Sequence, residues 1–133
     1  MKSVQLACMF LMLVFMASSA RADQLESYLG AWRQISSNAG DCPRCVVTVR
    51  RLGINLEAIS NNGWRATLRP TLKRLRGELP SVEGDGFWET GLSGQPKKIS
   101  IEVMLARDEA KLHMALVTGY PAARRVVEAT FEK

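Results

Sequence analysis

The chain has 133 residues, of which 47% are hydrophobic and 23% charged, and its formal net charge is +5. This length suits one small domain with one hydrophobic core, and no linker or low-complexity tract marks a second domain. Residues 23–133 retain 16 of the 18 basic residues and all 13 acidic ones, a net charge of +3. This charge is well short of what is typical of nucleic-acid-binding domains, so we expect no nucleic-acid partner.

Residues 1–22 have the pattern of a secretory signal peptide. Lys2 is followed by an apolar run, Leu6 to Ala17, and by a small-x-small cleavage site at Ala20-Arg21-Ala22. The run is shorter than the roughly 20 apolar residues of a membrane-spanning helix, so we expect cleavage rather than a stable transmembrane anchor. The sequence therefore predicts a helical signal peptide over 1–22 and a single periplasmic or secreted domain over 23–133.

The mature chain begins with helical periodicity and then changes to the period of strands. Leu25, Tyr28 and Leu29 recur at helical spacing behind Asp23, a residue type that caps helices. Short alternating or β-branched segments follow, separated by turn residues. We expect strands at 32–36, 45–52, 54–58, 64–68, 87–90, 99–105, 111–117 and 127–133, with a weaker candidate at 75–79.

One hairpin has a specific turn signal. The alternating runs 54–58 and 64–68 flank Ser60-Asn61-Asn62-Gly63. Asn62-Gly63 predicts a type I′ turn, because that turn requires positive φ at both central residues.

The number and spacing of the strands predict an all-β fold. About eight short strands at intervals of about 8–12 residues are typical of a sandwich or a small barrel. An open sheet would leave two unpaired edges, whereas a closed barrel leaves none. We therefore expect an antiparallel up-and-down barrel of about eight strands after the N-terminal helical turn.

The segment Tyr28-Leu29-Gly30-Ala31-Trp32-Arg33 resembles the opening Gly-x-Trp motif of lipocalins and other calycins. In that family the motif follows a helical turn and starts the first strand of an antiparallel barrel. Its tryptophan closes one end of the barrel and packs against a basic residue of the last strand. The resemblance implies that Gly30, Trp32 and either Arg124 or Arg125 close this barrel.

In length the chain is similar to avidins and to small periplasmic metalloprotease inhibitors built on a lipocalin-like barrel. Those inhibitors insert their mature N-terminus into the protease, which here would be Asp23-Gln24-Leu25. Their disulfide joins residues far apart in the sequence, whereas Cys42 and Cys45 lie in one loop. The resemblance to the inhibitors is therefore incomplete.

The motif Cys42-Pro43-Arg44-Cys45 has four interpretations. Haem attachment needs a histidine directly after the second cysteine, where Val46 stands, and structural zinc needs four ligands. We therefore expect no metal and no cofactor. The motif resembles the active site of thioredoxin-like oxidoreductases, but a strand-like run follows it instead of a helix whose dipole would lower the cysteine pKa. The pattern favours a structural disulfide in an oxidising compartment and leaves a redox role as an alternative.

Two sets of residues are candidates for ligand binding. Trp64 and Trp88, with Leu56 and Met114, either line an apolar ligand cavity or fill the core. The basic clusters either bind an anionic polymer or belong to a mixed solvated surface with the interspersed acids. These clusters are Arg50-Arg51, Lys73-Arg74 with Arg76, Lys97-Lys98 and Arg124-Arg125.

No set of residues in the sequence indicates catalysis. His113 is the single histidine, and the serines lie in turns without the surroundings of a nucleophile. We therefore expect a non-catalytic, exported, lipocalin-like binding protein that holds a small apolar ligand or binds or inhibits an exported protein. The alternatives are a thiol–disulfide protein that acts through Cys42 and Cys45, and a protein that binds an anionic envelope polymer.

Overall fold

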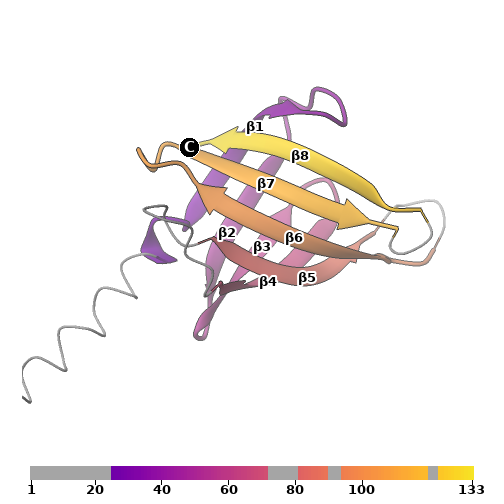
Figure 1. Ribbon diagram of the computed structural model, residues 1–133, viewed down its shortest axis with the longest axis horizontal. Coiled ribbons are helices and arrows are strands. Elements are labelled where there is room, and N and C mark those ends of the chain that lie inside the picture. Colours follow the sequence, from indigo (N-terminus) through magenta and orange to yellow (C-terminus); the bar gives the residue numbers. More distant parts are fainter. Residues whose placement is uncertain (1–24, 72–80, 90–93, 120–122) are drawn as a thin grey trace, which may run out of the picture.

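The alternating segments form eight antiparallel strands in a computed structural model that describes residues 25–71, 81–89, 94–119 and 123–133. Each strand pairs with the next, and β8 pairs with β1, so the sheet closes into an up-and-down barrel (Figure 1). The predicted fold is confirmed. The strands are β1 (Gly30–Ser37), β2 (Val46–Leu52), β3 (Asn55–Ser60), β4 (Trp64–Pro70), β5 (Val82–Trp88), β6 (Lys97–Leu105), β7 (Lys111–Thr118) and β8 (Arg125–Glu132).

Strand alternation fills the lumen of the barrel with side chains. In β6, for example, Ile99, Ile101, Val103 and Leu105 are buried while the residues between them are exposed. Buried side chains from all eight strands form one hydrophobic cluster. An eight-stranded barrel is just wide enough for side chains to fill its interior, so the core of this domain occupies its own lumen.

The fifth strand differs from its prediction because it includes two glycines. We expected a strand at 87–90, whereas β5 starts at Val82 and contains Gly84 and Gly86. A Cβ atom at Gly84 would collide with the carbonyl oxygen of Thr67, and one at Gly86 with that of Arg65. The glycines therefore allow the β4 and β5 backbones to approach more closely than side chains would permit.

The predicted hairpin between β3 and β4 is present, but its turn is not of type I′. The loop has three residues, Asn61, Asn62 and Gly63, and positive φ occurs at Gly63 (102°) and not at Asn62. The amide of Gly63 donates to the carbonyl of Ser60 at 3.3 Å. A three-residue loop places the left-handed conformation on its last residue, which explains why only the glycine adopts it.

The two ends of the barrel are built differently. At one end, here called the tryptophan end, a helical turn at 25–29 precedes β1, and the chain finishes at Lys133 (Figure 1). At the other, here called the disulfide end, lie the 38–45 loop, the 61–63 turn and the strand ends at Trp88, Lys97, Thr118 and Arg125. The predicted signal peptide, its cleavage site, the candidate strand at 75–79 and the basic cluster Lys73-Arg74 with Arg76 lie outside the described residues.

Candidate functional site

The Cys42–Cys45 pair forms a disulfide inside the loop that joins β1 to β2. The two Cα atoms are 5.3 Å apart, and the Cys45 amide donates to the Cys42 carbonyl at 3.0 Å. Cys45 is buried and leads directly into β2, so a strand follows the motif as predicted. The cysteines therefore lack the helix N-terminus that lowers the thiol pKa in thioredoxin-like enzymes.

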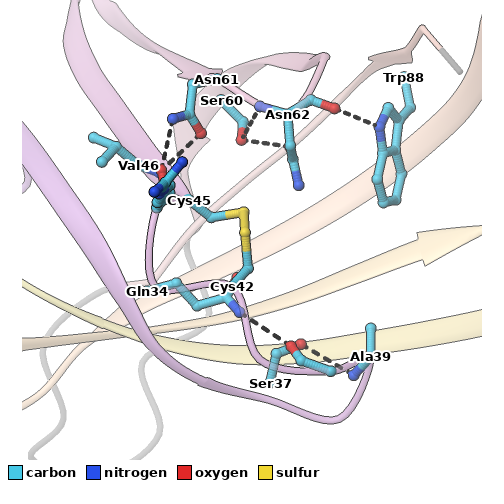
Figure 2. The surroundings of a disulfide bond; sticks show 12 residues. Gln34, Ser37, Ala39, Cys42, Cys45, Val46, Ser60, Asn61, Asn62 and Trp88 are labelled. Carbon is cyan, nitrogen blue, oxygen red and sulfur yellow. Dashed lines mark hydrogen bonds between the residues drawn. A yellow bond between two sulfur atoms is a disulfide. The ribbon is translucent and has the colours of Figure 1, made fainter. Parts of the chain in front are cut away.

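The hairpin turn at 61–63 fastens the disulfide loop to the barrel through the side chain of Asn61. Its Oδ1 accepts from the Val46 amide at 2.9 Å (Figure 2), and its Nδ2 donates to the Arg44 carbonyl at 2.7 Å. The Asn61 amide also donates to the Val46 carbonyl. One side chain thus continues the β2–β3 pairing beyond the end of the strands and holds the loop in place.

The same turn holds Trp88 at the rim of the barrel. The indole Nε1 donates to the Asn62 carbonyl at 3.1 Å (Figure 2), and the Glu89 amide donates to the Gly63 carbonyl at 2.9 Å. A Cβ atom at Gly63 would lie 2.9 Å from the Glu89 carbonyl oxygen, so the turn and the end of β5 are in close contact. The disulfide loop, the turn and Trp88 are therefore linked by hydrogen bonds.

The four residues predicted to line an apolar cavity occupy the core or its edge. Leu56, Trp64 and Met114 are buried in the hydrophobic cluster, and Trp88 is half-buried and packs against it. Leu56 pairs with Leu68 toward the tryptophan end, whereas Trp64 starts β4 at the disulfide end. These positions fit the alternative interpretation, in which the four side chains fill the lumen.

Trp32 closes the tryptophan end, but its basic partner differs from the prediction. The Trp32 side chain is fully buried, and its Nε1 donates to the Tyr28 carbonyl at 2.8 Å. The cation over its ring is Lys133, with Nζ 4.8 Å from the centroid, and not Arg124 or Arg125. The two arginines stand where β8 begins, at the disulfide end, so the prediction chose the wrong end of the last strand.

The helical turn at 25–29 completes this closure. Leu25 and Tyr28 are buried, while Arg51 of β2 donates to Glu26 at 2.9 Å and Ser27 donates to Glu109 at 3.0 Å. Burial raises the pKa of the Tyr28 hydroxyl to about 12, and a backbone hydrogen bond with Leu105 opposes part of that shift. Of the predicted inhibitory segment Asp23-Gln24-Leu25, the described residue Leu25 is therefore packed in the core.

Besides Arg65, which contacts Glu57, five basic residues gather at the disulfide end, where two acidic residues, Asp41 and Glu89, accompany them. The undescribed positions 90–93 and 120–122 add no charged residue. All five basic side chains are exposed, and within the described residues none of them forms an ion pair. The five are Arg44, Lys97, Lys98, Arg124 and Arg125.

The structure separates the predicted basic pairs into two kinds. Arg50 contacts Glu57 at 2.7 Å and Arg51 contacts Glu26 at 2.9 Å, so this pair takes part in the fold. Lys97-Lys98 and Arg124-Arg125 lie at the disulfide end without such partners in the described chain. Arg107 and Lys111 at the tryptophan end also lack ion pairs in the described chain, but Asp108 and Glu109 lie between them in the sequence, so among the described residues the excess of exposed cations is at the disulfide end.

The aromatic residues of the rim accompany these cations on both sides of the sheet. Trp88 pairs with Lys97 across β5 and β6, and Phe87 pairs with Lys98. By strand alternation the first pair faces the mouth of the barrel and the second faces outward. Sequence analysis did not select Phe87, although its position next to Trp88 in an alternating strand already placed it on the opposite face.

Comparison of the chain with protein-family models, with curated proteins and with solved structures finds no match. Among the described residues, no group of three or more histidine, cysteine or acidic side chains is arranged to hold a metal ion. In the same residues, no helix has the length and apolar character needed to cross a membrane. His113 lies on the outer face, where its Nδ1 is 3.1 Å from Thr130 Oγ1.

Proposed function

We propose that the protein is an exported, non-catalytic binding protein with a lipocalin-like barrel, and that it binds an anionic polymer of the cell envelope at the disulfide end. The observation that carries this proposal is the group of five exposed basic residues without ion pairs in the described chain. Unneutralised cations on one end of a small domain create a local positive potential that attracts polyanions.

The construction of this end supports a binding role. The disulfide and the Asn61 side chain hold the 38–45 loop, and Asn62 holds Trp88. A loop and rim held in one conformation lose little conformational entropy when a partner binds. Arg44 and Trp88 are therefore presented from a preorganised surface.

The other predicted functions have less support. A small apolar ligand would have to displace core side chains, because the lumen is filled. Inhibition of a protease by the N-terminus would require release of the buried Leu25. A thiol–disulfide activity would have to proceed without the activating helix at Cys42.

Retention on immobilised dextran sulfate, measured as the NaCl concentration at elution, tests the proposal. We expect the double substitution Lys97→Glu with Arg125→Glu to lower that concentration strongly, because screening by salt competes with each charge contact. The matched control is Arg107→Glu with Lys111→Glu, which changes the net charge equally at the tryptophan end. If the two double variants lower the NaCl concentration at elution equally, net charge alone causes retention and the proposal is overturned.

A further inference from the structure

Three side chains lie in a row on the outer face of the disulfide end. Phe87 of β5 pairs with Arg65 of β4 on one side and with Lys98 of β6 on the other. Phe87 is 53% exposed, which is unusual for a phenylalanine in a barrel whose other large aromatics are mostly covered. Because neighbouring strands lie about 4.8 Å apart, the backbone positions of the two cations are roughly 10 Å apart, with the phenyl ring between them.

Arg65 is oriented by a carboxylate that is itself nearly buried. Glu57 of β3 is 8% exposed, and it contacts Arg50 at 2.7 Å and the Nε of Arg65 at 3.8 Å. This contact is made by Nε, and the Arg65 side chain is 69% exposed. An exposed guanidinium can present paired donors to the carboxylate of a ligand.

The row borders a cleft on the outer surface over β3, β4 and β5. Its volume is about 500 Å³, and its lining includes Ile59, Arg65, Thr67, Asp85, Phe87 and Glu89. This volume lies in the range of about 300–1,000 Å³ that is common for ligand sites. The lining combines an apolar surface on Phe87 and Ile59 with hydrogen-bonding groups on Thr67 and Asp85.

Asp85 is placed to accept hydrogen bonds from hydroxyl groups. One of its carboxylate oxygens accepts from Ser100 at 3.0 Å, and the other lies 3.7 Å from Arg69. In β5 it stands two residues farther from the rim than Phe87, on the same face of the sheet. Of the charged residues that line the cleft, Arg65 and Glu89 lie toward the rim and Asp85 lies farther from it, while Lys98 lies on the other side of Phe87.

We infer that this cleft binds an acidic sugar residue, a pyranose ring that carries a carboxylate, within the anionic polymer. The apolar face of the sugar lies on Phe87, its carboxylate pairs with Arg65 or Lys98, and its hydroxyls bond to Asp85 and Thr67. A neutral sugar would offer no anion to Arg65 or Lys98, and a polyanion without sugar rings would not need the phenyl surface. This inference rests on the proposed function and narrows it to one class of polymer.

Trigalacturonate is the probe for this site, and its dissociation constant is measured by calorimetric titration of the exported protein. We expect Phe87→Ala to weaken binding by about tenfold, because the stacking surface is lost. Arg65→Gln should weaken it by a similar factor, and a neutral galactose trimer should bind more weakly than trigalacturonate. Met104→Ala is the matched control, since Met104 is an exposed apolar residue of the outer face toward the tryptophan end and should have no effect.

The outcomes separate this inference from the proposed function. Equal trigalacturonate binding by the Phe87→Ala and Met104→Ala variants would overturn the acidic-sugar site. Retention on dextran sulfate through Lys97 and Arg125 without any binding of trigalacturonate would overturn the site and leave the proposed function in place. Failure of the unmodified protein to bind either ligand would overturn both.

Discussion

The two ends of the barrel use the same residue types for different purposes. At the tryptophan end, Trp32 is fully buried and the ammonium of Lys133 lies over its ring. At the disulfide end, Trp88 is half-buried and pairs with the exposed Lys97. An aromatic–cation combination therefore closes the fold at one end and remains accessible at the other.

The helical turn at 25–29 covers the tryptophan end, and this cover accounts for much of the difference. Leu25 and Tyr28 pack over the tryptophan end and complete its core. The disulfide end is held by a disulfide and by hydrogen bonds of Asn61 and Asn62, which order the loops with less added apolar cover. We therefore expect substitutions at the tryptophan end to affect mainly stability, and those at the disulfide end to affect mainly binding.

Truncation of the two tryptophans should give the largest contrast. Trp32→Ala removes a fully buried side chain and should lower the free energy of unfolding by about 3–5 kcal/mol. Trp88→Ala should cost less, because part of that side chain already contacts solvent. Urea denaturation of both variants measures the difference.

A loss of this size is a large part of the total stability of a small domain, so the Trp32→Ala variant can fail to fold. Trp32→Phe then serves instead, since it retains an aromatic ring while removing the indole hydrogen bond to Tyr28. An equal or greater loss of stability for Trp88→Ala would contradict the proposed division between the ends.

Alkaline pH should weaken the tryptophan end through Tyr28. Its pKa is raised from 10.0 to about 12 in the folded state, so the unfolded chain releases the proton first. Stability is therefore retained below pH 10 and falls as pH rises toward 12, by at most about 2–3 kcal/mol at about 1.4 kcal/mol per pH unit. Urea denaturation at pH 9, 10, 11 and 12 measures the slope, and Tyr28→Phe should remove this component. The same slope in both proteins would show that another group causes it.

Removal of the disulfide should lower the free energy of unfolding less than Trp32→Ala does, and its local effect should be at the disulfide end. Cys42→Ser with Cys45→Ser opens a short loop, for which chain entropy gives about 2 kcal/mol of lost stability. Because Asn61 and Asn62 link the loop to Trp88, the tryptophan emission of the native state should also change. Native emission identical to that of the unmodified protein would indicate that the loop does not affect the Trp88 environment.

The barrel could be predicted from local patterns, whereas the closure by Trp32 was implied by the resemblance to the Gly-x-Trp motif of lipocalins. Alternation in the Ile99–Leu105 segment is a property of consecutive residues, and Gly30-Ala31-Trp32 was sufficient to place Trp32 at the start of the first strand. Such signals require only that strand residues alternate between two faces. The start of β5 was predicted too late in the sequence, because Gly84 and Gly86 lie in the strand and glycines usually indicate turns.

The candidate site depended on strand register, which the sequence does not display. Arg65, Phe87 and Lys98 come from three strands and meet only because those strands pair as they do. The basic pairs gave no indication of which cations would be neutralised, since Glu57 reaches Arg50 and Arg65 across strands. The position of Lys133 over Trp32 likewise depends on where β8 ends.

Neutralising one cation at each end should change the free energy of unfolding least. It is also the most direct test of the different roles of the two ends. Lys133→Met keeps a long unbranched side chain but removes the charge over Trp32, so the free energy of unfolding should fall by about 0.5–1 kcal/mol. Arg125→Met removes a cation without an ion pair in the described chain, so the urea midpoint should be unchanged while elution from dextran sulfate shifts to lower salt. The reverse assignment, with Arg125 needed for stability and Lys133 for retention, would mean that the tryptophan end is the binding surface.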